Sequence, residues 1–377
     1  MVADVPVGAF LSGGIDSSAV VALMRRHATG TVKTFSLGFS IGGAYNELPD
    51  ARRVANHFGT EHHELRVDRF DMVQTLQKLV YHFDEPFSDP ANFPVYLLSE
   101  FARREVTVIL TGEGGDELFG GYRRYVAEQA AGAYQKLPRF LTDGVVPGIV
   151  NSVPRLRRMK RIVQTLPIAD PALRYPAWLQ VFSREMRNDL LRPAVQSDMG
   201  AYDPASAYSH YYRHPLNGGA SLDHLNRLMY VDLKTWLADA YMEKVDKATM
   251  AFGLEGRLPF LDHRLVELAF QIPARLKVRG LTTKRILKRA LKGLLPEEVL
   301  RKRKHGFAVP NDPWFRGAMG NYVFETLLDD RTAARGYFDS AYIEKLFRLH
   351  REGKEVYDSQ LWLLLNFELW NRIYIDR

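Results

Sequence analysis

A glycine-rich turn between an apolar run and a helix pattern lies close to the start of the chain. Residues 7–20 read Val-Gly-Ala-Phe-Leu-Ser-Gly-Gly-Ile-Asp-Ser-Ser-Ala-Val. Small residues in such a turn let backbone N–H groups at the start of the following helix converge on an anion, which the helix dipole also favours. The pattern therefore predicts a strand, a polyphosphate-binding loop and a helix in succession.

The same loop contains an acid and no lysine. It thus differs from the G-x-x-x-x-G-K-[ST] loop, in which a lysine reaches the phosphates. A carboxylate at Asp16 beside a polyanion is unfavourable unless a hard cation such as Mg²⁺ lies between them, so we expect Asp16 to be a metal ligand. The alternative is an ordinary strand-to-helix turn in which Ser17 or Ser18 caps the helix.

The first third of the chain alternates short β-rich runs with helical periodicity, which is typical of βαβ units on a parallel sheet. Ligands of an open sheet bind at the carboxyl ends of its strands, so the loops after residues 11, 39, 65 and 110 should share one edge. The pattern predicts strands at Val7–Leu11, Thr34–Phe39, Glu61–Leu65 and Val106–Leu110, and helices near 17–27, 48–58, 71–80 and 93–104.

Beyond residue 126 the β-rich runs become rare and prolines divide a mainly helical sequence. We expect an α/β fold and a single domain over 1–377. In it, 1–125 form an open, mainly parallel sheet with helices on both faces. The mostly helical part, 126–377, should pack on this core and contribute residues to the substrate site.

Composition excludes several classes of site. The 377 residues contain no cysteine, which excludes disulfides, thiolate metal sites and cysteine nucleophiles within them. No apolar run approaches the roughly 20 residues that span a bilayer, so we expect a cytoplasmic enzyme. The net charge of +7 is concentrated in 155–161 and 284–305. Aromatic residues do not interleave these basic runs, which disfavours nucleic-acid binding. Only a few residues precede the first strand, from which we expect upstream sequence to be missing.

An acidic, glycine-rich segment follows the strand predicted at Val106–Leu110. It reads Thr111-Gly-Glu-Gly-Gly-Asp-Glu-Leu-Phe-Gly-Gly-Tyr122. Asp116 and Glu117 could simply stabilise a helix N-terminus. That account leaves Glu113 unexplained, because it lies between two glycines on the same sheet edge as the phosphate loop. Such a position suits a general base or an acid that holds an amine.

Two further charged residues fit a phosphate site. Asp84 lies among prolines that extend the backbone, and it could join Asp16 around Mg²⁺; a capped proline turn is the alternative. Lys284 is expected in the first turn of a helix over 282–291 that Thr282 caps and that buries Ile286, Leu287, Ala290 and Leu291. A cation there opposes the helix dipole unless it faces an anion such as a triphosphate. The alternative is a solvated lysine.

Taken together, these segments resemble the synthetase domain of the asparagine synthetases, in the expected order and over essentially the whole chain. The loop Ser12–Ser17 alone is similar to that of the wider PP-loop superfamily, the ATP pyrophosphatases. The narrower signals are the segment 111–122, Val245–Met250 and Arg257–Asp262, supported by 45–55, 59–64 and the late Lys304–Pro310.

This resemblance implies ATP and Mg²⁺ as cofactors and a reaction in two steps. ATP adenylates the aspartate β-carboxylate with release of pyrophosphate, and ammonia then displaces AMP to give asparagine. Carried onto matching positions, the resemblance implies that the β,γ-phosphates are held by Ser12, Gly13, Gly14, Asp16, Ser17 and Ser18. It implies nucleoside contacts from Leu11, Leu37 and Gly112, and Mg²⁺ binding by Asp16 and Asp84. Glu113 would serve the attacking amine, and Lys284 would stabilise charge at the α-phosphoryl centre. Asp116 is counted among the cofactor-binding residues.

One departure from the family concerns nitrogen supply. Its members typically carry an N-terminal glutaminase domain with a cysteine nucleophile, and this sequence has neither. We therefore expect small-molecule substrates (aspartate, ATP and ammonia) and a glutaminase domain or subunit as partner. A homodimer stays open, and neither nucleic acid nor a membrane is expected.

Three other functions are considered. The first is a related amide-forming synthetase, similar to β-lactam synthetase or amidating a sugar or peptide precursor. The second is a tRNA-modifying PP-loop enzyme, which only the basic runs support. The third is a non-catalytic nucleotide-binding module, against which the retained Asp16, Glu113 and Lys284 argue.

Overall fold

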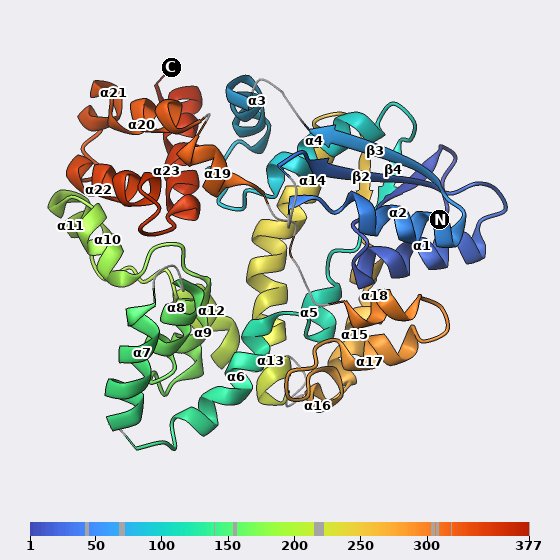
Figure 1. The fold of residues 1–377 in the computed structure, drawn as a ribbon, viewed down its shortest axis with the longest axis horizontal. Helices are drawn as coiled ribbons and strands as arrows, with labels where there is room; N and C mark the ends of the chain where they lie inside the picture. The colour runs from blue at the N-terminus through green and yellow to red at the C-terminus, as the bar shows by residue number, and fades with distance from the viewer. Residues whose placement is uncertain are drawn as a thin grey trace. The chain divides into compact units, whose positions relative to one another are not determined.

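The computed structural model describes residues 1–41, 45–67, 72–138, 140–153, 157–214, 222–302, 306, 309–317 and 319–376 (Figure 1). The chain divides into two compact units. The first comprises Met1–Phe83, Ala91–Val126 and Ser221–Pro310, and the second comprises Asp84–Pro90, Ala127–Ala220 and Asn311–Arg377. The mainly helical sequence after residue 126 is thus shared between the two units.

The first unit contains all five strands of the sheet. Its elements are β1 (Val7–Phe10), α1 (Ile15–His27), β2 (Lys33–Phe39), α2 (Leu48–Phe58), β3 (Glu61–Val67), α3 (Met72–Phe83), α4 (Asn92–Ala102), β4 (Val108–Leu110), α5 (Gly115–Phe119), α13 (His224–Asp232), the π-helix η3 (Leu233–Met242), α14 (Glu243–Met250), β5 (Glu255–Arg257), the 3₁₀ turn η4 (Pro259–Leu261), α15 (His263–Gln271), α16 (Ala274–Lys277), α17 (Arg285–Ala290) and α18 (Glu297–Arg301).

The second unit is helical over its described residues, and α6 (Arg123–Tyr134) crosses the division between the units. The other elements of this unit are η2 (Phe140–Val145), α7 (Val146–Ser152), α8 (Arg157–Thr165), α9 (Pro171–Leu179), α10 (Arg184–Leu190), α11 (Pro193–Met199), α12 (Ser206–Arg213), α19 (Asn311–Arg316), α20 (Gly320–Leu328), α21 (Asp330–Ala334), α22 (Ser340–Arg351), α23 (Asp358–Trp370) and η5 (Asn371–Ile375).

The sheet is entirely parallel, with strand order β3-β2-β1-β4-β5. From β1 the chain winds outward through β2 to β3, and it then crosses back to β4 on the other side of β1. Because parallel crossovers are right-handed, this reversal puts α1 and α2 on one face and α4 on the other, as Figure 1 shows. The predicted α/β fold with helices on both faces is confirmed.

The reversal of winding lies between β1 and β4, which pair directly in register from Val7 with Val108 to Ala9 with Leu110. The segments that leave these two strands both start at the carboxyl ends, the edge at which ligands of open parallel sheets bind. Both glycine-rich segments identified in the sequence, 11–14 and 111–115, leave the sheet at this point. The topology therefore brings them together.

Burial of α1 against the sheet explains why the first segment folds as it does. Val20, Val21 and Met24 on the helix and Ala9 on β1 are each at most 4 % exposed and share one apolar cluster. Leu300 of α18, nearly three hundred residues later, belongs to the same cluster. The start of the chain is thus packed against a segment close to the end of the first unit.

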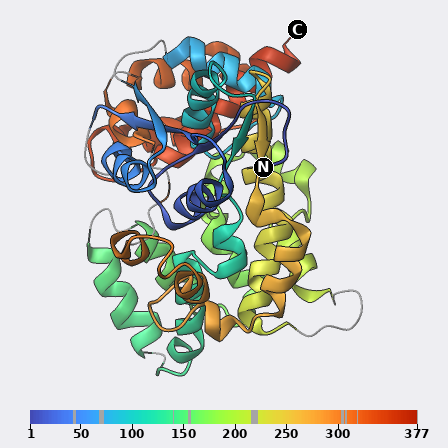
Figure 2. The ribbon, with the colours of Figure 1, turned by 90° about the vertical axis from the view of Figure 1, so that its right-hand side faces the viewer.

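A long helical column passes through the first unit, because α13, η3 and α14 follow one another without a break (Figure 2). It buries Asp232 and Lys244 and is thus not apolar throughout. Among the described residues, no helix is both long enough and apolar enough to cross a membrane.

Most element boundaries predicted for the first 110 residues differ from the structure by one to three residues, and α2 spans the predicted 48–58. The structure differs from the sequence pattern in two further places. β5 was missed, because its three residues Glu-Gly-Arg have no strand pattern and are extended only through pairing with β4. The helix expected from Thr282 instead begins at Arg285, and Ala290, expected on its buried face, is exposed.

Parts of three sequence motifs lie outside the described residues. They are Arg155 in the first basic run, 303–305 in the second, and Lys304, His305, Phe307 and Ala308 in the late motif.

Candidate active site

The phosphate loop is closed by the hydroxyls of Ser12 and Ser17. The Ser12 amide donates to Ser17 Oγ at 3.3 Å, the two Oγ atoms lie 3.0 Å apart, and the Gly14 amide donates to Ser12 Oγ at 3.3 Å. These contacts curl the backbone between β1 and α1 into a compact turn. The predicted sequence of strand, loop and helix is confirmed, and the hydroxyls have a structural role in it; their binding role stays a prediction.

The second glycine-rich loop lies directly against the start of α1. A Cβ atom on Gly112 would stand 2.7 Å from the Ser17 amide nitrogen and 3.1 Å from Asp16 Cβ. Real Cβ atoms do not approach backbone so closely, so only glycine permits this packing. The loop after β4 therefore places Glu113 next to the loop after β1.

Lys284 joins the two loops through its ammonium group. Its Nζ contacts Asp16 Oδ2 and lies 2.6 Å from Asp116 Oδ1. The lysine is only 3 % exposed, and a buried charge of this kind is stable only when it is paired. Three residues that the sequence analysis selected separately thus form one ionic cluster.

The backbone at Lys284 is left-handed, with φ 52°. A residue with a Cβ atom in this conformation costs on the order of 1–2 kcal/mol. Among the described residues, Asp84 is the only other non-glycine residue with positive φ, also 52°. Such outliers persist where surrounding structure imposes them, and they gather at functional sites. Lys284 is thus aimed at the cluster from just before α17, rather than from the first turn of that helix.

Asp16 and Asp116 together form a donor set that suits a hard cation. Both carboxylates face the ammonium of Lys284, and carboxylate oxygens are preferred ligands of Mg²⁺. Asp84 belongs to the second unit, where its carbonyl oxygen accepts a hydrogen bond from Trp370 Nε1 at 2.8 Å. Its predicted pairing with Asp16 stays a prediction.

Glu113 is half-buried and makes no hydrogen bond or ion pair with any other described residue. The neighbouring acids differ from it, because Asp116 pairs with Lys284 and Glu117 accepts a hydrogen bond from Tyr122 Oη at 2.5 Å. Of the three carboxylates in the loop, Glu113 is therefore the one whose oxygens are committed to no described partner. This distinction agrees with its predicted role toward an amine.

Glu117 is a buried acid whose behaviour the sequence did not reveal. Burial, together with the negative charge of Asp116, raises the pKa of its carboxyl to about 7. Its partner Tyr122 is half-buried, and desolvation raises the pKa of that hydroxyl well above its ordinary value. Arg124 and Tyr125, which follow this loop in the chain, donate hydrogen bonds to the buried Asp232. The hydrogen bonds of Glu117 and Asp232 thus form a polar network next to the acidic loop 111–122.

Of the residues predicted to contact the nucleoside, Leu37 lies in β2, while Leu11 and Gly112 follow β1 and β4. Leu11 and Leu37 are each 2 % exposed, and the Leu11 carbonyl accepts a hydrogen bond from Ser36 Oγ. Ser18, predicted to hold phosphate, is fully buried in α1. The binding roles of these residues remain predictions.

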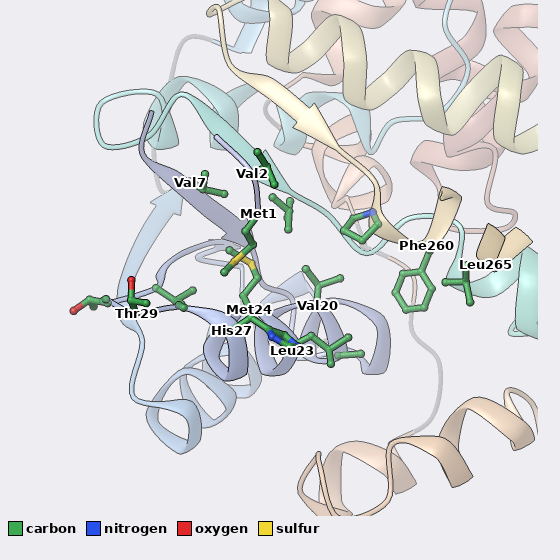
Figure 3. Close-up of a pocket in the computed structure, with 17 residues that line it drawn as sticks. Met1, Val2, Val7, Val20, Leu23, Met24, His27, Thr29, Phe260 and Leu265 are labelled. Atoms are coloured by element: carbon green, nitrogen blue, oxygen red, sulfur yellow. The ribbon is translucent and has the colours of Figure 1, made fainter. Parts of the chain in front are cut away.

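A pocket of about 740 Å³ lies in the first unit, away from the ionic cluster. Figure 3 shows that it is bordered by Val20, Leu23 and Met24 of α1 and by Phe260 and Leu265. Its lining is mainly apolar and includes none of the predicted site residues. The cavity is therefore distinct from the candidate active site.

The raised pKa of Glu117 predicts a specific pH dependence of stability. Because the carboxyl titrates at about 7 in the folded chain and near 4.5 when unfolded, its contribution is complete below pH 4.5 and is lost as the pH rises to about 7. The slope is at most about 1.4 kcal/mol per pH unit. Urea unfolding across this range should show the decline in the native sequence and a flatter profile in Glu117→Gln. The exposed Glu267→Gln is the control and should keep the native pH dependence. If the free energy of unfolding falls equally with pH in the native sequence and in Glu117→Gln, the assignment is contradicted.

Comparison with known proteins agrees with this geometry. The asparagine synthase family model matches residues 1–372. Asparagine synthetase [glutamine-hydrolyzing] 1 of Bacillus subtilis is 34% identical over the whole chain, and a putative asparagine synthetase of Mycobacterium tuberculosis is also 34% identical over the whole chain. An amidase, chry2, of Gibberella zeae is 24% identical over 89% of the chain. The chain spans 57%, 56% and 54% of the lengths of these three relatives. It belongs to the asparagine synthase family.

Proposed function

We propose that this chain activates the β-carboxylate of aspartate with ATP and then converts it to an amide with ammonia, giving asparagine, AMP and pyrophosphate. The observation that carries this proposal is the cluster of Asp16, Asp116 and Lys284 at the point where the sheet reverses its winding. Two acids and one cation beside a phosphate loop suit the transfer of an adenylyl group, in which charge must be neutralised at several phosphate oxygens.

Activation is required by the chemistry of the acid. A carboxylate cannot expel oxide, so it must first form a mixed anhydride with AMP, whose phosphate is a good leaving group. The turn between β1 and α1 would hold the β- and γ-phosphates through backbone N–H groups. Lys284 would stabilise negative charge that develops at the α-phosphoryl group. Mg²⁺, held by Asp16 with Asp116 or with the predicted partner Asp84, would supply further charge neutralisation.

Glu113 would act in the second step. Its carboxylate is committed to no described partner and lies between the glycines that bring its loop against α1. In this position it can hold ammonia or accept a proton from the attacking amine. The acyl-adenylate would then lose AMP as the new carbon–nitrogen bond forms.

We further propose that ammonia reaches this site from a glutaminase domain or subunit. The names of the Bacillus subtilis and Mycobacterium tuberculosis relatives include glutamine hydrolysis, and the chain spans a little over half of their length. The 377 residues contain no cysteine that could act as the nucleophile of glutamine hydrolysis.

The test of the proposed function is pyrophosphate release from Mg-ATP, measured with and without aspartate and ammonium while asparagine is assayed in parallel. We expect pyrophosphate release to depend on aspartate, and asparagine to form with ammonium but not with glutamine. Release that depends on a different acid would move the substrate to the related amide-forming synthetases. No release with any acid would contradict the proposal.

Replacing Glu113 should separate the two steps. Glu113→Gln keeps the size of the side chain but removes its basicity, so asparagine formation should fall by roughly 10²–10⁴-fold while aspartate-dependent pyrophosphate release is affected less. The exposed Glu344→Gln serves as the matched control. Unchanged asparagine synthesis by Glu113→Gln would remove this residue from the mechanism.

Replacing Asp16 should alter the requirement for metal. Asp16→Asn removes one carboxylate charge, so we expect half-maximal pyrophosphate release to need a several-fold higher Mg²⁺ concentration. Titration of Mg²⁺ at fixed ATP measures this shift, with the exposed Asp198→Asn as control. If the Mg²⁺ dependence stays that of the native sequence, Asp16 is not a metal ligand.

A further inference from the structure

The phosphate loop contains no lysine of its own, yet the structure places one beside it from a distant segment. Lys302 directly follows α18, and its Nζ donates a hydrogen bond to the Gly13 carbonyl at 3.4 Å. These two residues are 289 positions apart in the chain. The fold thus brings an ammonium group to the loop that the local sequence does not supply.

An ion pair holds this ammonium in place. Lys302 Nζ pairs with Asp50 in the first turn of α2, and its side chain remains 28 % exposed. Arg53 of α2 pairs with the same Asp50 and also approaches Glu298 of α18 at 3.9 Å. Since Leu300 of α18 is buried in the cluster that contains α1, the helix that precedes Lys302 is anchored by packing and by charge.

Asp50 is pressed against the phosphate loop itself. Gly13 has φ +69°, and a Cβ atom there would lie 2.7 Å from both the carbonyl carbon and the Cβ of Asp50. Glycine is therefore required at this position by conformation as well as by space. Because Asp50 packs against Gly13 and Lys302 binds the Gly13 carbonyl, the Asp50–Lys302 pair borders the phosphate loop.

We propose that Lys302 is a phosphate-binding residue, whose ammonium group moves from Asp50 onto the terminal phosphates of a nucleoside triphosphate held in the loop. Lys284 cannot do this in the same way, because it is buried between Asp16 and Asp116. Lys302 has a flexible stem and a partly exposed side chain, and its partners among the described residues are Asp50 and the Gly13 carbonyl. This inference rests on the proposed function, because it takes the Ser12–Gly14 turn to be the site of the β- and γ-phosphates.

Binding of inorganic pyrophosphate tests the proposal without requiring turnover. Titration calorimetry in the presence of Mg²⁺ gives the Kd for the native sequence, for Lys302→Met, which keeps the apolar stem, and for Lys302→Arg, which keeps the charge. A charge-assisted hydrogen bond to phosphate predicts at least about tenfold weaker binding in Lys302→Met and near-native binding in Lys302→Arg. Arg301→Met is the matched control. Arg301 is exposed and pairs with Glu297 at 3.4 Å, so its loss should leave pyrophosphate binding as in the native sequence.

A second variant distinguishes ligand binding from a structural clamp. Asp50→Asn removes the partner of Lys302 but leaves its ammonium group, so pyrophosphate binding should be retained or strengthened. If Asp50→Asn weakens binding as much as Lys302→Met does, or if Lys302→Met binds like the native sequence, the proposal is overturned. Thermal unfolding of each variant checks that the fold is intact.

Steady-state kinetics separates this proposal from the proposed function. In an active chain, Lys302→Met should raise the KM for ATP at least about tenfold and change kcat less. The native sequence could bind added pyrophosphate and yet release none from ATP with any acid. In that case the proposed function fails, while the calorimetric comparison of the variants still decides the role of Lys302. If turnover is normal and Lys302→Met changes neither the Kd nor the KM, only this inference fails.

Discussion

The ammonium group of Lys284 between Asp16 and Asp116 is the interaction on which the arrangement of the site depends. A charge that is buried so completely must be compensated, and here the two partners come from the first turns of α1 and α5, each of which follows a strand. The lysine therefore fixes the loop after β1, the loop after β4 and the segment before α17 relative to one another. The left-handed backbone at Lys284 is the conformational cost of this arrangement.

The position of the cluster follows from the winding of the sheet. Strand order β3-β2-β1-β4-β5 makes β1 and β4 adjacent, so the segments that follow them leave the same edge of the sheet. Open parallel sheets bind their ligands at such a point. What distinguishes this chain is the absence of side chains at Gly112, which lets the second loop lie on the start of α1 and leaves Glu113 beside the ionic cluster.

Sequence patterns located most of the sheet, but they did not predict how Asp16, Asp116 and Lys284 meet. Strand alternation and helical periodicity are local, so β1, α2 and α4 could be located from the sequence. β5 has no local signal, because pairing with β4 alone extends it. Lys284 was selected by an argument about a helix dipole, but the structure places it outside the helix. Lys302 and the buried Glu117 were not selected, because their importance arises from neighbours that only the tertiary fold supplies.

The distance in sequence between the parts of the ionic cluster bears on how the chain reaches its native state. Asp16 and Lys284 are separated by 268 positions, and closing so long a loop is entropically costly until many other contacts have formed. During synthesis from the N-terminus, β1 and α1 emerge long before the lysine that compensates Asp16. Until β5 and Lys284 have left the ribosome, the nascent sheet has neither the strand that pairs with β4 nor the lysine that compensates Asp16. An open strand edge favours wrong pairing, so this stage of synthesis is exposed to misfolding.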